Sequence, residues 1–197
     1  MKSEHPLIAP LGDEEAESAA RSVGVAGGFV NMNLFRTSLR QPGVAQIWAT
    51  VVNKLVVNGR LDARLRELVI LRVAWVSHGS YEWANHYAYA IKIGMNDAEI
   101  LAVRNWQDDG PALSADDRRV LKTVDSILAL RPPSASDVAE LKSILGGDGP
   151  LMELLIMPGI YRTLSMFTDT LAIPLDDGKT FWPPDGIAPL IDHRHEA

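Results

Sequence analysis

The stretch of sequence that decides the fold is Arg66 to His86, RELVILRVAWVSHGSYEWANH. After Glu67 its first half is apolar at nearly every position, which is typical of a helix in the middle of a fold or an assembly. The dipeptide Gly79-Ser80 breaks this helix, and a second helical spacing resumes beyond it. The segment therefore predicts a helix over about 63–77, a short break, and a second helix over 81–93.

Ionisable residues on these two helices share faces. Glu67 and His78 lie on one face of the first helix, because steps of four, three and four residues return to nearly the same angle. On the second helix, Glu82 and His86 are four residues apart and are therefore neighbours. If the break folds the two faces together, carboxylates and imidazoles will share a largely apolar interior. Such an environment raises carboxyl pKa values, and a Glu/His pair there can pass protons near neutral pH.

The remainder of the chain is also helical in pattern. Asp13 and the acidic residues after it are typical of a helix start, and Gly27-Gly28 ends that helix. Pro158-Gly159 is expected to kink or split the last helix, because proline removes a backbone donor and clashes with the preceding turn. Further helices are expected over 29–39, 44–57, 97–105, 115–130, 136–146 and 148–172. No strand pairs are evident, so the predicted fold class is all-α.

The domain organisation follows from length and from the distribution of proline. A chain of 197 residues is long enough for one core, and residues 1–172 are predicted to form a single all-helical domain. Residues 173–197 contain prolines at 174, 183, 184 and 189. They predict an irregular C-terminal arm, which could wrap a neighbouring subunit or be disordered.

Charge and hydropathy exclude several function classes. The net charge is −6 and the basic residues are scattered, whereas a nucleic-acid groove or an anionic membrane surface needs clustered positive charge. The most apolar window, 68–76, is far shorter than the roughly 20 residues of a membrane span. The N-terminus has no apolar segment typical of a signal peptide. We therefore expect a soluble cytoplasmic protein with no nucleic-acid or membrane partner.

Cysteine is absent from the chain. This excludes disulfides, thiolate nucleophiles and thiolate metal ligands. Glu67, His78, Glu82 and His86 could in principle bind a transition ion through carboxylate and imidazole groups. Carboxylate-bridged helical bundles, however, repeat a Glu-x-x-His unit on two helices, and this chain has one Glu-x-x-x-His. We therefore expect neither a metal nor another cofactor.

The same residues carry a resemblance to a known family. Glu67, Gly79, Glu82 and His86 reproduce the spacing Glu-x(11)-Cys-x-x-Cys-x(3)-His of the alkylhydroperoxidase-D-like proteins. The surrounding residues, over about 60–104, resemble the carboxymuconolactone decarboxylase family. They are Arg66-Glu67-Leu68-Val69, Tyr81-Glu82-Trp83, His86, Ala90, Gly94 and Asn96-Asp97-Ala98-Glu99-Ile100. The resemblance implies a family core over about 44–106, built on a helical hairpin, and homo-oligomers, trimers or hexamers, with sites near subunit contacts.

The departures from the family pattern restrict the chemistry. The two positions of the redox cysteines are Gly79 and Glu82 here, and peroxide reduction needs a thiolate and a resolving thiol. Family-typical alkylhydroperoxidase or peroxiredoxin activity is therefore disfavoured. Glu67 and His86 remain as proton-handling residues, Glu82 is an added acid, and Tyr81 is a candidate donor beside them.

The decarboxylase branch of the family implies chemistry that needs no thiol. Loss of carbon dioxide from a carboxy-lactone leaves an enolate-like carbanion, which must receive one proton. The hypothesis is a cysteine-independent carboxy-lyase or isomerase acting on a small carboxylated lactone or organic acid. His86 would donate the proton, oriented by Glu67 or Glu82. The alternative is a non-catalytic helical oligomer.

Structural roles for the same residues stay open. Glu67 could pair with a nearby arginine, His86 could be a hydrogen-bonded core histidine, and a Glu/His pair four residues apart also supports a helix. Trp75 is interpreted as a packing residue, because aromatic side chains bury large apolar areas. Tyr81 and Tyr161 could face the pocket, but packing is the simpler interpretation for both.

Overall fold

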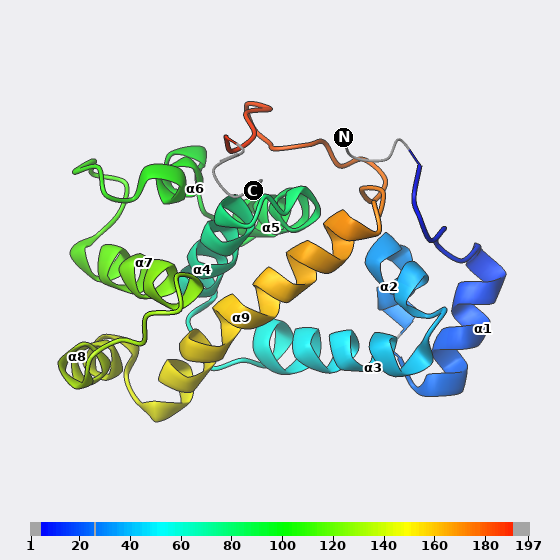
Figure 1. The fold of residues 1–197 in the computed structure, drawn as a ribbon, viewed down its shortest axis with the longest axis horizontal. Coiled ribbons are helices and arrows are strands. Elements are labelled where there is room, and N and C mark those ends of the chain that lie inside the picture. Colours follow the sequence, from blue (N-terminus) through cyan, green and yellow to red (C-terminus); the bar gives the residue numbers. More distant parts are fainter. Residues whose placement is uncertain (1–4, 26, 191–197) are drawn as a thin grey trace, which may run out of the picture.

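The computed structural model describes residues 5–25 and 27–190, and the regular structure within them is helical throughout (Figure 1). The all-α prediction is therefore confirmed for this part of the chain. Its α-helices are α1 (Asp13–Val23), α2 (Asn33–Ser38), α3 (Pro42–Val51), α4 (Ala63–Val76), α5 (Ser80–Lys92), α6 (Asp97–Ala102), α7 (Ala115–Leu128), α8 (Ala135–Leu145) and α9 (Asp148–Thr170). Short 3₁₀-helices cover Gly27–Asn31 and Val103–Asn105, and a π-helical turn over Val52–Val57 extends α3. No helix in the described ranges has the length and apolar character needed to cross a bilayer.

Helix α4 lies at the centre of the fold and packs against α5, α7 and α9. Its side chains from position 66 to position 74 are all buried, as the continuous apolar run predicts. The helix begins at Asp62, whose carboxylate accepts from the backbone amides of Arg64 and Leu65 at 3.0 and 3.1 Å. This N-cap satisfies amides that have no partner within the helix. The central hairpin of α4 and α5 is therefore fixed by burial along α4 and by the cap at its start.

Helix α9 crosses the hairpin diagonally and contacts α4, α5, α7 and α8 (Figure 1). It continues without interruption through Pro158, so the expected split at Pro158-Gly159 is wrong. Proline removes one backbone hydrogen bond, but Leu154, Met157 and Tyr161 bury the same stretch of helix against the core. Packing on both sides of Pro158 therefore maintains the helix. Because α9 is one continuous helix, Tyr161, Ser165 and Thr168 lie on successive turns of it where it crosses the hairpin.

Two hydrophobic clusters lie on opposite sides of α4. One joins α1, α2, α3 and α9 and includes Phe35, Trp48 and Met157. The other joins α4, α5, α6 and α7 and includes Trp83 and Ile100. Three charged residues of α4, Arg66, Glu67 and Arg72, are buried between these clusters.

Residues 173–190 contain neither helix nor strand and pack on their own chain. Trp182 is buried beside Trp75 and Trp83, with ring centroids 5.8 and 5.9 Å apart. Trp83 Nε1 donates to the carbonyl of Pro183 at 2.7 Å, and Arg104 pairs with Asp185 at 2.7 Å. The segment passes over α5 in Figure 1. That the arm also wraps a neighbouring subunit stays a prediction, and its part from 191 to 197 lies outside the described residues.

Candidate functional site

Glu67 on α4 and His86 on α5 are in direct contact. His86 Nδ1 lies 2.7 Å from Glu67 Oε2. The Glu67 side chain is 0% exposed and that of His86 is 16% exposed, so the acid is inside the protein and the imidazole lies at its edge. With the carboxylate as acceptor, Nδ1 carries the shared proton and Nε2 is the nitrogen that faces away from Glu67. No described residue hydrogen-bonds Nε2.

Arg66 completes the contacts of the Glu67 carboxylate. Its Nε donates to Glu67 Oε1 at 3.0 Å, and its guanidinium lies 5.6 Å from the centre of the Tyr89 ring. Both carboxylate oxygens of Glu67 are therefore engaged, one by Arg66 and one by His86. The Nη2 atom of Arg66 is buried without a hydrogen-bond partner, and a buried donor of this kind is costly.

Tyr161 on α9 packs edge-on against the His86 ring, with centroids 5.2 Å apart and an interplanar angle of 81°. It is buried, and burial raises the pKa of its hydroxyl well above the usual value. The charges of Glu67 and Glu82 raise this pKa further. The Tyr161 hydroxyl therefore keeps its proton, and no described residue hydrogen-bonds it.

Glu82 lies in the first turn of α5 and is fully buried against α9. Thr168 donates its hydroxyl hydrogen to the Glu82 carboxylate at 3.0 Å. Burial raises the pKa of Glu82 to about 7, although the hydrogen bond from Thr168 and the nearby His86 oppose part of this rise. Glu82 is therefore an acid that gains and loses its proton near neutral pH.

Gly79 brings α5 and α9 into close contact. A Cβ atom built on Gly79 would lie 2.7 Å from Ser165 Cβ and 2.8 Å from Glu82 Oε2, and closer still to Ser165 Oγ. Contacts this short do not occur in folded proteins, so the arrangement requires glycine at this position. The space that a cysteine side chain would take at position 79 is thus filled by the carboxylate of Glu82 and the hydroxyl of Ser165.

Tyr81 belongs to a different hydrogen-bond network. Its hydroxyl donates to the carboxylate of Asp176 at 2.8 Å and accepts from the backbone amide of Leu34 at 3.1 Å. Burial and the Asp176 charge raise the pKa of this hydroxyl. The structure thus ties Tyr81 to α2 and to the C-terminal segment, with no hydrogen bond to Glu67 or His86, and its place among the catalytic residues stays a prediction.

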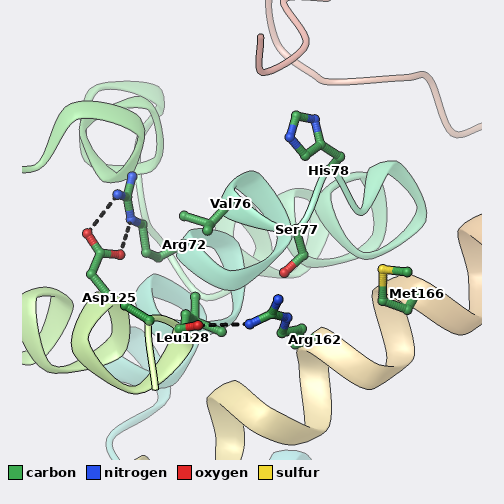
Figure 2. A pocket seen from close by; sticks show the side chains of 9 residues that line it. Arg72, Val76, Ser77, His78, Asp125, Leu128, Arg162 and Met166 are labelled. Atoms are coloured by element: carbon green, nitrogen blue, oxygen red, sulfur yellow. Dashed lines mark hydrogen bonds and ion pairs between the residues drawn. The ribbon is translucent and has the colours of Figure 1, made fainter. Parts of the chain in front are cut away.

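His78 also lies apart from the Glu67–His86 pair. It stands in the turn between α4 and α5 with a left-handed backbone, φ 57°, and lines a pocket of about 460 Å³ between α4, α7 and α9 (Figure 2). The described residues contain no group of three or more histidine, aspartate or glutamate side chains arranged to hold a metal ion. Around the Glu67–His86 pair, few oxygen or nitrogen atoms are free to bind a metal, because both carboxylate oxygens of Glu67 already have hydrogen-bond partners.

Several members of the cluster were not expected from the sequence. Thr168 and Ser165 give no signal of their own, because a hydroxyl on a distant helix has no fixed spacing from the 66–86 segment. For Tyr161 the sequence favours packing over a position in the pocket, and the structure packs its ring against His86. Arg66 was within the matching segment, and a pairing of Glu67 with a nearby arginine was the structural alternative for that residue.

Comparison with known proteins identifies the fold and a family match. Residues 42–115 match the model of the carboxymuconolactone decarboxylase family. Among solved structures, a Cys-to-Ala variant of the debrominase Bmp8 in complex with 2,3,4-tribromopyrrole is similar, with a TM-score of 0.72 and 14% identity over 89% of this chain and 94% of that one. An uncharacterised peroxidase-related protein from Silicibacter sp. TM1040 has a TM-score of 0.66 and 17% identity over 88% and 90% of the two chains. Among curated proteins, none matches this sequence.

Proposed function

We propose that this protein is a cysteine-independent acid/base enzyme of carboxy-lyase or isomerase type, because residues 42–115 match the model of the carboxymuconolactone decarboxylase family. Its substrate would be a small carboxylated lactone or organic acid. The observation that carries the proposal is the 2.7 Å hydrogen bond between His86 Nδ1 and the fully buried Glu67 carboxylate. A buried carboxylate that orients an imidazole is a recurrent arrangement for general acid/base catalysis.

His86 is the proposed proton donor. Glu67 holds Nδ1, so Nε2 is left to exchange protons with the substrate. In the decarboxylation, the bond between the substrate carbon and its carboxylate breaks, and the electron pair moves into an enolate. The enolate carbon then takes the proton from Nε2, and carbon dioxide leaves. The imidazole regains a proton from solvent at its exposed edge.

Two further acids support this assignment. The Tyr161 ring packs against His86, and its hydroxyl keeps its proton. This hydroxyl is therefore suited to donate a hydrogen bond to a developing oxyanion. Glu82, with a pKa of about 7, can hold a second exchangeable proton inside the same cluster. Proton-transfer groups work best when their pKa lies near the operating pH.

A non-catalytic role is the second candidate. Its supporting observation is that Glu67 and Glu82 are almost completely inaccessible, and Arg66 with Glu67 forms a buried ion pair of the kind that can fix packing alone. In this case the protein would be a helical binding or assembly unit. Thiol peroxidase activity has no residue to perform it, since the chain has no cysteine.

The test is a substrate screen with matched variants. Purified protein is incubated in D₂O with carboxylated lactones and β-keto acids, and products are followed by mass spectrometry. Turnover with one deuterium placed on carbon is expected, and it should be lost in His86→Gln and strongly reduced in Glu67→Gln. Lys92→Gln, an exposed change on the same helix, is the control. Turnover that survives in His86→Gln would remove His86 from the mechanism. No turnover of any compound by the wild type would contradict the enzyme function and favour the non-catalytic role.

A further inference from the structure

We propose that the pocket between α4, α7 and α9 binds a small organic monocarboxylate, whose charged group pairs with the guanidinium of Arg162. The pocket has a volume of about 460 Å³, within the range of about 300 to 1,000 Å³ that is usual for small-molecule sites. It contains none of the residues assigned above to acid/base chemistry. The proposal is therefore independent of the proposed function.

The pocket already contains one ion pair, and that pair is satisfied internally. Arg72 donates from Nε and Nη2 to the two carboxylate oxygens of Asp125 at 2.7 and 2.8 Å (Figure 2). Its Nη1 donates to the carbonyls of Val103 and Arg104. Asp125 also accepts from Trp106 Nε1 at 2.8 Å. The Asp125 charge is thus neutralised by a fork-shaped partner and is not a strong repellent for an incoming anion.

Arg162, the other arginine that lines the pocket, is not part of this ion pair. Its Nη1 donates to the backbone carbonyl of Leu128 at 2.8 Å, and none of the described carboxylates forms an ion pair with it. A guanidinium carries five N–H donors in one plane, and two parallel donors match a carboxylate. Arg162 and Ser77 both line the pocket (Figure 2). The remaining N–H groups of Arg162 and the Ser77 hydroxyl are therefore donors in the pocket wall.

Apart from His78, the rest of the wall is apolar, and Val76 and Met166 are exposed. Val76 comes from the end of α4, Leu128 from the end of α7 and Met166 from α9, one turn beyond Arg162. A ligand with a compact hydrocarbon or aromatic body would cover these side chains and remove apolar surface from water. A bare oxyanion would use Arg162 but leave this wall uncovered. The combination favours a monocarboxylate with a small apolar body.

The competing interpretation is purely structural. Leu128 is the last residue of α7, and an arginine that binds a carbonyl in the last turn stabilises the helix end. That role uses one N–H group of Arg162 and predicts no ligand. The two interpretations differ in what happens when a carboxylate is added, so binding decides between them.

The experiment is a titration followed by backbone amide NMR, with benzoate and butanoate as probes and benzamide as the neutral match of benzoate. Saturable binding of at least one carboxylate is expected, with shifts at Ser77, Ala129 and Met166. Benzamide should bind at least about tenfold more weakly, since it lacks the charge that pairs with Arg162. Binding should weaken as salt is added, because the pair is open to solvent.

Variants separate the site from the fold. Arg162→Met should lower carboxylate affinity about tenfold or more, while Arg162→Lys should keep part of it, because lysine retains the charge but not the fork. Arg162→Lys also preserves a test if the methionine variant does not fold. Arg21→Met, at an exposed position on α1, is the matched control and should bind as the wild type does. His86→Gln should also retain binding, which separates this proposal from the proposed function.

Any of the following outcomes would overturn the proposal. The first is no saturable binding of either carboxylate by the wild type. The second is equal binding of benzoate and benzamide. The third is undiminished binding by both Arg162 variants, or shifts that map to the surroundings of His86 rather than to the pocket.

Discussion

The carboxylate of Glu82 and the backbone of Gly79 lie so close that a Cβ on Gly79 would be 2.8 Å from Glu82 Oε2. The two residues occupy the positions at which the resembled alkylhydroperoxidase-D-like pattern has its cysteines. Gly79 has no side chain, and the Glu82 carboxylate occupies the space that is left free beside it. A side chain added at position 79 alone would therefore overlap its neighbours and lower the free energy of unfolding.

Gly79→Ala is expected to destabilise the protein by about 1–3 kcal/mol or more, because the added Cβ overpacks a site already filled by Ser165 and Glu82. The free energy of unfolding from urea denaturation gives the value. Gly110→Ala is the control, since a Cβ there meets nothing within 4 Å, and its change should stay within about 0.5 kcal/mol. Equal stability of the two variants would show that the contact at Gly79 relaxes without cost.

Glu82 makes stability depend on pH in a direction that can be stated. Its pKa is raised from 4.5 to about 7 in the folded protein, so the native state holds a proton that the unfolded chain has lost. Stability from this group is fully present below pH 4.5 and falls as the pH rises through 7. The total is on the order of 3 kcal/mol.

Glu82→Gln should remove this part of the pH dependence. The variant minus wild-type difference in unfolding free energy is expected to grow in favour of the variant between about pH 5 and pH 8. Urea denaturation at a series of pH values measures it. Glu14→Gln, at an exposed position on α1, serves as the control with a flat difference. A flat difference for Glu82→Gln as well would mean that Glu82 is ionised in the folded protein across this range.

The hairpin was predictable because its information is local. The continuous apolar run of α4, the break at Gly79 and the spacing of Glu67, Glu82 and His86 all lie within 21 residues of sequence. Helical periodicity converts such spacings directly into shared faces. Once the break turns the chain back, α5 packs against α4 and the faces that carry Glu67 and His86 meet.

The contacts that α9 makes with this hairpin were not predictable in the same way. Tyr161, Ser165 and Thr168 reach the hairpin because α9 crosses it, and the angle and offset of that crossing are set by packing over the whole interface. The interruption expected at Pro158 was wrong for the same reason, because tertiary contacts of Leu154 and Met157 outweigh a local preference. Tyr81 lies one residue from Glu82 in sequence but hydrogen-bonds Asp176, which is 95 residues away.

The buried ion pair of Arg66 and Glu67 predicts a strong effect from an unbalanced substitution. Glu67→Ala leaves the Arg66 guanidinium buried without its counter-charge, which is expected to cost about 3–5 kcal/mol of unfolding free energy. Removing both charges in Arg66→Met/Glu67→Leu should cost clearly less, since apolar residues of similar size replace a buried pair well. A double variant as unstable as Glu67→Ala would show that the pair contributes more than charge balance.

Tyr81 is expected to act through the C-terminal segment rather than through proton transfer. Tyr81→Phe removes the hydroxyl that joins Asp176 to the amide of Leu34 and leaves both groups with one partner fewer. This should cost about 1–3 kcal/mol and speed amide hydrogen exchange over residues 173–190, because that segment loses an anchor to α5. Tyr87→Phe is the control, since its hydrogen bond to Asp97 is at the exposed surface of the same helix. If Tyr81→Phe abolishes turnover of a substrate while exchange in the segment is unchanged, Tyr81 belongs with His86 after all.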